Sequence, residues 1–360
     1  MSTAPIYFTV GPTQLYPTVV AHLKQAIQDR ILSISHRSKQ FQDIYQNTDT
    51  ALRKLLNIPS SHHIFFVGSS LESMERTIQN CVKSTSFHFV NGAFSQKFQN
   101  IAHSLGKKTY SQVIEFGKGI DSQDIKNNAS KSAELICVTH TETSSGACTT
   151  PDAIKRLRRL YPDKLIAVDT VSSAPFIDFT ISLVDVLFFS VQKGFGLPAG
   201  LGVLVVSDRA LEKSRKIQKS GLSVGSYHSF ESLYEKFRLW QTPETPNVMG
   251  IYLLGKVAED MLKKGIKTMV KEEEKKSKLL TEYFAMSSIG HLLIKKPKHR
   301  SRSIIVVETK GNSLEIIEKL KLKGFIVGAG YGEYKNKHIR IANYPAHTLD
   351  GVNLLIKKLN

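Results

Sequence analysis

With 360 residues, 41% of them hydrophobic, the chain is long and apolar enough for one large domain and a smaller one, which excludes a disordered protein. It has no apolar run of membrane-spanning length, no secretion signal at its start and three scattered cysteines, so we expect a cytoplasmic protein with no membrane contact, disulfide framework or metal site. The formal net charge is +18, but most lysine and arginine residues are dispersed among glutamates. The one dense basic cluster, at residues 295–302, has no interleaved aromatic residues, so we expect no nucleic-acid partner.

The chain begins with an extended arm and continues with two amphipathic helices. Glycine and proline interrupt residues 6–17, which is typical of an irregular segment. Apolar residues then recur at helical spacing over 19–27 and again over 41–56. A polar loop at 34–39, which carries adjacent histidine and arginine residues, separates the two helices.

From residue 63 the pattern alternates between buried strands and helices, which predicts an α/β fold with a mostly parallel sheet covered on both faces. The predicted strands are 64–67, 87–90, 113–116, 135–139, 165–169, 186–191 and 203–206. The predicted helices between them are 71–81, 95–105, 152–160 and 208–219. In such sheets ligands bind outside the carboxyl ends of the strands, so we expect the chemistry there.

The last third of the chain has a different sequence pattern, which predicts one long helix followed by a short alternation of strands and helices. The predicted elements are a helix at 248–284, a strand at 304–308, a helix at 314–323, a strand at 338–342 and a helix after 348. We therefore predict three parts: an N-terminal arm (1–15), a large domain (16–255) and a small α+β domain (256–360).

A lysine at the mouth of a glycine-rich turn is the strongest candidate for chemistry. Lys193 follows the apolar run 186–191, and five glycine or proline residues separate this run from the next one at 203–206. An amine fixed where a buried strand ends, on backbone that allows close approach, suits a carbonyl cofactor held as a Schiff base. The alternative is a lysine that caps a strand.

The strand predicted at 165–169 ends in a carboxylate, Asp169. A buried aspartate is costly unless it faces a cation, and the pyridinium nitrogen of pyridoxal phosphate would provide one. A carboxylate in that position keeps the ring nitrogen protonated, so that the ring can accept electrons. The alternative is an ordinary turn or helix-capping aspartate.

Three further strand ends carry side chains that complement such a cofactor. Ser69 and Ser70 precede a predicted helix, whose first N–H groups could bind a phosphate. Phe94 could stack on a planar ring, and Thr143 could donate a hydrogen bond to a ring hydroxyl or phosphate. Each has an ordinary alternative: helix-capping serines, a core phenylalanine and a hydroxyl-rich turn. Together, however, the five strand ends offer the parts of one site.

These residues resemble a known family, the class V, fold type I pyridoxal-phosphate-dependent aminotransferases, and within it the phosphoserine aminotransferase branch. The resemblance extends over nearly the whole chain and is most specific at 34–39, 190–200 and 245–255. It implies a large domain with a mostly parallel sheet, a smaller α+β C-terminal domain and pyridoxal 5'-phosphate as cofactor. It also implies transamination between phosphoserine and 2-oxoglutarate in serine biosynthesis by a homodimer with shared active sites.

The resemblance also implies a set of site residues. Lys193 and Asp169 correspond to the family's catalytic lysine and aspartate. The implied cofactor-binding residues are Ser69, Ser70, Leu71, Phe94, Thr143, Asp169, Gln192, Lys193, Glu244 and Thr245, the last two reaching across to the partner's cofactor phosphate. The implied substrate-binding residues are His36, Arg37 and Arg340.

Three departures from the family pattern bear on function. Phe94 stands where a stacking tryptophan is usual. Glu244 stands where an asparagine is usual, and its charge would repel a phosphate unless it turns away or pairs. The family's His-Arg pair before the last arginine is absent, and residues 328–335 replace it, with Lys335 or Lys337 as candidate substitutes.

The missing pair leaves the amino donor open, because a phosphomonoester needs more than one cationic partner. Alanine–glyoxylate and serine–pyruvate aminotransferases, which need no such cations, are the alternative within the family. A cysteine desulfurase would need a cysteine in a late loop, and none follows Cys148. A non-enzymatic basic binding protein is the alternative outside enzymes.

Overall fold

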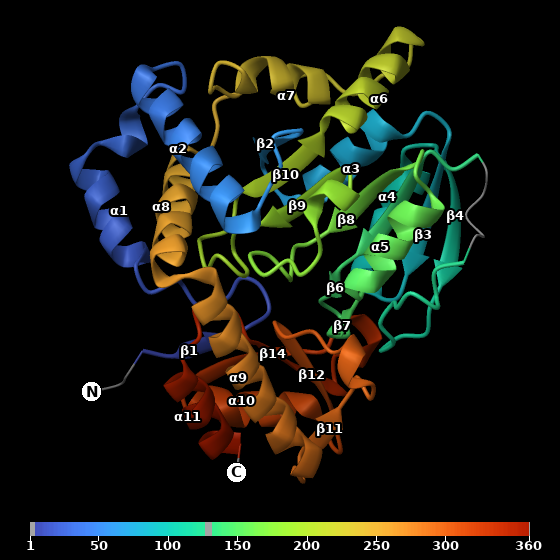
Figure 1. Cartoon of the computed structure of the whole chain (residues 1–360). Helices are drawn as coiled ribbons and strands as arrows, with labels where there is room; N and C mark the ends of the chain where they lie inside the picture. Colours follow the sequence, from blue (N-terminus) through green and yellow to red (C-terminus); the bar gives the residue numbers. More distant parts are fainter. Residues whose placement is uncertain (1–3, 127–131, 360) are drawn as a thin grey trace.

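Two large β-sheets and a two-strand hairpin organise the chain (Figure 1). The computed structural model describes residues 4–126 and 132–359. Within these ranges no helix combines the length and the apolar character that crossing a membrane requires.

The larger sheet has seven strands in the order β2-β10-β9-β8-β5-β3-β4. Its strands are β2 (His62–Val67), β3 (Thr85–Val90), β4 (Lys108–Val113), β5 (Leu135–Thr139), β8 (Leu165–Asp169), β9 (Val186–Ser190) and β10 (Gly202–Ser207). β10 runs antiparallel to β2 and β9, and the other pairs are parallel. Strands β5, β8, β9 and β10 are buried on both faces, which is why they form continuous apolar runs in the sequence.

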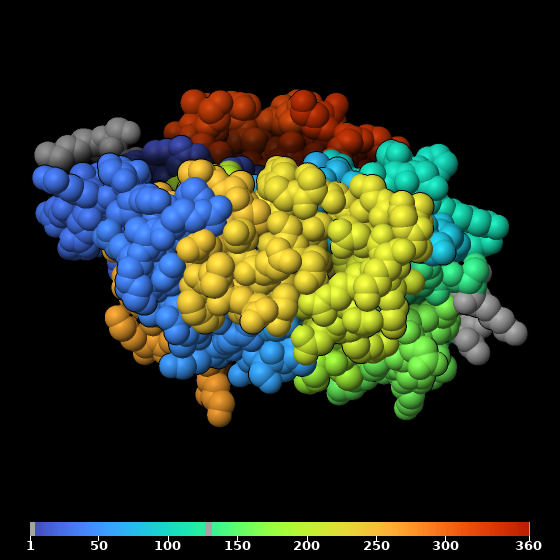
Figure 2. Space-filling view, turned by 90° about the horizontal axis from the view of Figure 1, so that it is seen from above, coloured from blue at the N-terminus to red at the C-terminus, as the bar shows by residue number. Residues whose placement is uncertain are grey.

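Helices cover both faces of this sheet and enclose two apolar cores. They are α1 (Val19–Gln28), α2 (Lys39–Leu56), α3 (Ser70–Cys81), α4 (Ala93–Ser104), α5 (Pro151–Leu160), α6 (Asp208–Lys219), α7 (Phe230–Phe237) and α8 (Val248–Lys264), with 3-10 turns at Ile31–Ser33 and Ile181–Leu183. α2 packs along α8. Seen from above, the segment with α7 lies between α2, in blue, and α6, in yellow (Figure 2).

The smaller sheet has five strands in the order β1-β13-β14-β12-β11. Its strands are β1 (Ile6–Phe8), β11 (Gly290–Leu292), β12 (Ile304–Thr309), β13 (Phe325–Ala329) and β14 (His338–Ala342). The helices of this part are α9 (Ile266–Met286), α10 (Ser313–Leu322) and α11 (Leu349–Leu359), with 3-10 turns at Pro297–His299 and Gly332–Tyr334. α9 packs on α11 over a separate apolar core. The N-terminal arm thus supplies an edge strand, because β1 pairs in parallel with β13.

Two predicted elements were wrong. The strand expected at 113–116 lies earlier, as β4 at Lys108–Val113. Since β4 is an edge strand with several exposed polar residues, it lacks the apolar run that the prediction relied on. The single helix expected at 248–284 is two helices, because Gly265 adopts a left-handed φ of 87° between α8 and α9.

Candidate active site

The carboxyl ends of five parallel strands meet around one cavity of about 290 Å³. The predicted residues that line it are Ser70, Leu71, Phe94, Thr143, Asp169, Gln192, Lys193 and Arg340. They lie at the end of β8 (Asp169) or shortly after β2, β3, β5 and β9, except Arg340, which lies in β14 of the smaller sheet. The cavity therefore lies where the two sheets face each other.

Lys193 points into this cavity from the turn after β9. Its Nζ donates hydrogen bonds to Thr143 Oγ1 at 3.0 Å and Ser172 Oγ at 2.9 Å, and it lies 5.3 Å from the centre of the Phe94 ring. Burial lowers the pKa of Lys193 to about 8, although the charge of Asp169 opposes this shift. A larger fraction of this amine is therefore unprotonated near neutral pH than of an ordinary exposed lysine, and the unprotonated form is the one that acts as a nucleophile.

Asp169 is the last residue of β8 and is 3% exposed. One carboxylate oxygen accepts the Val171 N–H at 2.8 Å, and the carboxylate forms no ion pair within 4.0 Å in the described part of the chain. Burial raises the pKa of Asp169 to about 7, although the Val171 N–H and Lys193 oppose this shift. A cationic group placed in the cavity would stabilise its charged form.

The start of α3 presents helix-terminal N–H groups at another wall of the cavity. Ser69 is the helix cap, since its Oγ accepts the Glu72 N–H at 3.1 Å, and the Ser70 N–H donates to Ser190 Oγ at 2.9 Å. Nearby, Gln192 has a buried Oε1 with no hydrogen-bond partner among the described residues. The N–H groups of the helix start give this wall a positive potential, which suits an anionic group.

Glu142, which the sequence analysis did not single out, fixes the helix that carries Phe94. Its buried carboxylate accepts the N–H groups of Phe94 at 3.2 Å and Ser95 at 3.0 Å, so it caps α4. Gly92 allows this approach, because a Cβ there would lie 2.4 Å from Glu142 Cγ. No sequence signal indicated this role, since Glu142 lies in a run of small hydroxyl residues.

Arg340 and Tyr331 form the side of the cavity nearest the smaller sheet. Arg340 donates from Nε to Ala329 O at 2.7 Å and from Nη1 to Thr143 O at 3.4 Å. The Tyr331 ring lies 5.6 Å from the guanidinium carbon and 5.3 Å from the Phe94 ring. Tyr331 comes from the segment that replaces the family's His-Arg pair, so an aromatic ring stands in this wall.

The candidate cations Lys335 and Lys337 are exposed and do not line the cavity. Lys97, one turn along α4 from Phe94, lines it instead. Its Nζ lies 5.8 Å from the Phe94 ring centre, and it forms no ion pair within 4.0 Å in residues 4–126 and 132–359. Sequence reasoning missed Lys97 because it is one of many helical lysines.

The remaining predicted residues, His36, Arg37, Glu244 and Thr245, form a second group that does not line this cavity. Arg37 binds the loop before Glu244 with three hydrogen bonds, to Gln241 Oε1 at 2.9 Å, Thr242 O at 2.8 Å and Pro243 O at 3.1 Å. Arg37 and Thr245 are exposed. Burial and the adjacent Arg37 lower the pKa of His36, whereas Glu244 raises it.

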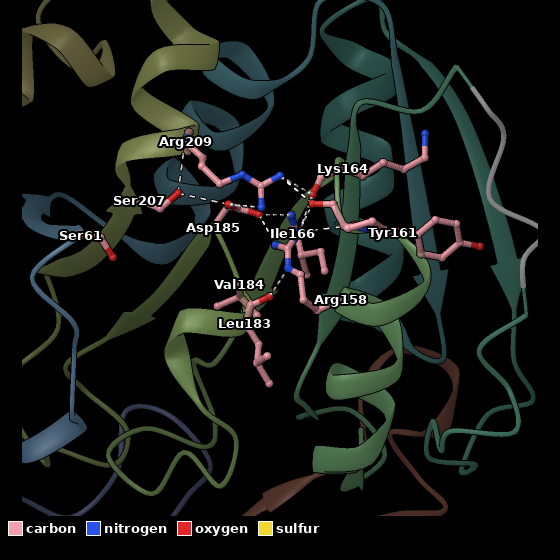
Figure 3. Close-up of polar contacts among 12 residues, drawn as sticks. Ser61, Arg158, Tyr161, Lys164, Ile166, Leu183, Val184, Asp185, Ser207 and Arg209 are labelled. Carbon is pink, nitrogen blue, oxygen red and sulfur yellow. Dashed lines mark hydrogen bonds and ion pairs between the residues drawn. The ribbon is translucent and has the colours of Figure 1, made fainter.

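A charged cluster at the opposite, amino end of the strands holds the large sheet together (Figure 3). Asp185 accepts from Arg158 of α5 at 2.5 Å and lies 3.5 Å from Arg209 of α6. It also accepts the Ile166 N–H at 2.9 Å and the Ser207 hydroxyl at 3.3 Å. Every carboxylate oxygen is thus engaged, which indicates a structural role.

A cleft of about 880 Å³ adjoins this cluster and is larger than the cavity at Lys193. Several of its charged side chains are paired within the chain, for example Lys213 with Glu134 and Lys216 with Glu212. The smaller cavity has the unpaired Asp169 and the buried amine. It is therefore the better candidate for catalysis.

A mostly parallel sheet that presents a buried lysine and aspartate at its carboxyl edge, together with a smaller α+β unit, defines the fold type I class of pyridoxal-phosphate-dependent transferases. A family model described as "Aminotransferase class-V" matches residues 6–333. The chain belongs to this family and is an aminotransferase, so its substrates are amino acids and 2-oxo acids.

Several of the known proteins that are similar to the chain are named phosphoserine aminotransferase. A phosphoserine aminotransferase structure from Cytophaga hutchinsonii is 45% identical, with a TM-score of 0.95, and the match covers 99% of this chain and 98% of that one. Phosphoserine aminotransferase of Rhodococcus opacus is 24% identical over 98% of this chain and 94% of its own length. An alanine–glyoxylate aminotransferase structure from Nostoc, 20% identical with a TM-score of 0.84 and covering 100% and 95% of the two chains, shares the fold.

Proposed function

We propose that the chain is a pyridoxal-phosphate-dependent phosphoserine aminotransferase, which exchanges an amino group between O-phospho-L-serine and 2-oxoglutarate in serine biosynthesis. The observation that carries this proposal is that Lys193 and Asp169 line one cavity without forming an ion pair with each other. The similarity to the Cytophaga hutchinsonii phosphoserine aminotransferase supports the choice of substrate. We also propose a cytoplasmic location.

The residues of the cavity fit pyridoxal phosphate. The N–H groups of Ser70 and Leu71 at the start of α3 would hold the phosphate, and Gln192 would donate to it from Nε2. Asp169 would face the ring nitrogen, and Phe94 would lie against the ring. When bound, the cofactor supplies a carbonyl that accepts the substrate amine and a ring that takes up the electron pair released at Cα.

The chain's own residues would provide the proton transfers and the orientation. The Lys193 amine, whose pKa burial lowers to about 8, would remove the Cα proton as a base and, once protonated, would donate a proton as an acid. Thr143 and Ser172, which accept hydrogen bonds from Nζ, would orient it. Arg340 would bind the substrate α-carboxylate and so fix the Cα–H bond relative to Lys193.

The substrate carries a second anionic group at its side-chain end, and the charges in the cavity suit it. Lys97, Lys193 and Arg340 line the cavity together with one carboxylate, Asp169. Since no described carboxylate pairs with Lys97, its ammonium would be available to a phosphate or to the distal carboxylate of a 2-oxo acid. We propose Lys97 in place of Lys335 and Lys337.

We further propose a homodimer with shared sites. His36, Arg37, Glu244 and Thr245 lie together outside the cavity of their own chain, and Arg37 is tied to the loop that precedes Glu244. Such a group would reach the cavity of a second copy as one unit. It would then add His36 and Arg37 to the cations around the substrate phosphate.

The second candidate is an alanine–glyoxylate or serine–pyruvate aminotransferase. Tyr331 and the exposed Lys335 and Lys337 favour it, because they leave this wall without the His-Arg pair. The test is a half-reaction: the cofactor-loaded protein is mixed separately with phosphoserine, serine or alanine, and its visible absorbance is followed. Rapid bleaching by phosphoserine supports the proposal, whereas bleaching by alanine and none by phosphoserine supports the second candidate. A protein that binds no pyridoxal phosphate would contradict both.

A further inference from the structure

A buried histidine joins the helix at the proposed phosphate site to the loop at the proposed dimer contact. His228 Nδ1 is hydrogen-bonded to Glu72 Oε1, and its Nε2 lies 2.9 Å from Glu244 Oε2. The His228 side chain is 5% exposed. Glu72 lies in the first turn of α3, and its other oxygen accepts the Gly68 N–H at 2.8 Å.

The two contacts require a doubly protonated ring. A neutral imidazole has a single N–H, whereas each nitrogen of His228 faces a carboxylate oxygen. Burial lowers the pKa of His228, but the hydrogen bonds with Glu244 and Glu72 outweigh it and raise the pKa to about 9. The ring is therefore a cation at neutral pH.

The surrounding charges do not replace this cation. On α3, the charge of Arg76 acts on Glu72 less strongly than His228 does, and its guanidinium is hydrogen-bonded to Glu75. On the α1–α2 loop, Arg37 binds oxygen atoms of the loop before Glu244, and the pKa of neighbouring His36 is lowered by burial and by Arg37. The Tyr227 ring, 4.2 Å away, lies against the imidazole but carries no charge. Without His228, two carboxylates would face each other near the phosphate site.

We propose that His228 is a positioning residue for cofactor-phosphate binding, which holds Glu244 away from the phosphate and ties its loop to α3. This inference rests on the proposed function. It accounts for the tolerance of a glutamate at a position where the family usually has an asparagine. Because the loop that carries Glu244 and Thr245 would reach the partner's cofactor while Glu72 lies in the first turn of α3, beside the chain's own, His228 would support both sites of a dimer.

The test measures the affinity of the apoprotein for pyridoxal phosphate. The readout is the fluorescence of Trp240, the chain's sole tryptophan, which precedes the loop. We expect His228→Asn to raise the dissociation constant about tenfold or more, because two uncompensated carboxylates would repel an anionic ligand. The double variant His228→Asn/Glu244→Asn, which also removes the carboxylate that His228 compensates, should regain most of the lost affinity.

The matched control is His63→Asn, which removes another histidine paired with a carboxylate, Asp208, at 2.8 Å but far from the cavity. It should leave the affinity unchanged. A purely structural role for His228 would lower the melting temperature of both His228 variants without rescue of affinity in the double variant. That result, or an unchanged affinity in His228→Asn, overturns the inference.

A pH series covers the case in which His228→Asn fails to fold. The wild type should lose affinity above about pH 9 more steeply than Glu244→Asn, because deprotonated His228 leaves Glu244 uncompensated. Equal pH profiles would overturn the inference. If the wild type binds no pyridoxal phosphate at any pH, the proposed function fails instead, so the two failures are distinguishable.

Discussion

Asp169 ends β8 and Lys193 lies just after the neighbouring parallel strand β9, and both line the same cavity, yet they form no ion pair within 4.0 Å. Both side chains are buried. Burial raises the pKa of Asp169 and lowers the pKa of Lys193, so it favours the neutral form of each. The separation leaves room for a group that contacts an amine at one side and a carboxylate at the other. This pair is the basis of the first prediction.

Lys193→Ala should reduce kcat about 10³-fold or more, because it removes both the amine that binds a carbonyl and the base that moves the Cα proton. Steady-state kinetics with phosphoserine and 2-oxoglutarate measure this loss, and circular dichroism shows whether the fold is kept. The control is Lys335→Ala, which changes an exposed lysine of the smaller sheet's loop. Turnover of Lys193→Ala close to that of the wild type would refute the assignment.

Lys97→Ala should raise the KM for phosphoserine about 10-fold to 100-fold, since a hydrogen bond to a charged group contributes roughly 1.5–3 kcal/mol. The half-reaction with alanine should be unaffected, because alanine lacks a second anionic group. Lys97→Arg should keep most of the affinity. A similar KM for phosphoserine in the alanine variant and the wild type would exclude Lys97 from the substrate site.

Arg340→Lys should raise the KM for both amino-acid and 2-oxo-acid substrates by about tenfold or more. A lysine lacks the planar pair of donors that binds a carboxylate at two points, and it would also lose the contact with Ala329 O. Steady-state kinetics with each substrate varied in turn measure the change. An effect confined to one substrate would indicate a role other than binding the α-carboxylate.

Mixed dimers test the proposed sharing of sites. Lys193→Ala and Arg37→Ala proteins should each be weakly active, but unfolding and refolding them together should restore up to about a quarter of wild-type activity. Half of the dimers would then be mixed, and one of their two sites would have both residues intact. If Arg37 served its own chain, mixing would restore nothing.

The pH dependence of stability should include a contribution from Glu273, which lies between the two sheets. Burial raises the pKa of this glutamate from 4.5 to about 8, although Arg302, 3.7 Å away, opposes the shift. The folded state thus binds the proton more tightly than the unfolded state, so its contribution is present below pH 4.5 and is lost as the pH rises through 8.

Glu273→Gln should therefore raise the melting temperature of the apoprotein by several degrees at pH 9 and change it little at pH 5. Thermal unfolding followed by circular dichroism measures both. An equal effect at the two pH values would contradict the expected proton linkage.

Buried strands explain why part of the site could be predicted. β8 and β9 are apolar up to their last residue, so Asp169 at the end of β8 and Lys193 just after β9 stood out. β4, an edge strand, carried no such signal. Glu142 and Lys97 could not be predicted in the same way. Glu142 caps α4 and Lys97 lies on it, so the roles of both depend on how α4 packs against β5 and α3, which is a tertiary contact. The division into domains and the roles of the site residues stay predictions.

The first strand links the two sheets to the reactive amine. β1 is hydrogen-bonded into the smaller sheet, and a few residues later Gly11 lies so close to Lys193 that a Cβ there would be 2.9 Å from Lys193 Cε. Thr13 N–H then donates to Gln192 O at 3.1 Å. A movement of the smaller sheet relative to the larger one would therefore be transmitted along residues 8–13 to the packing around Lys193.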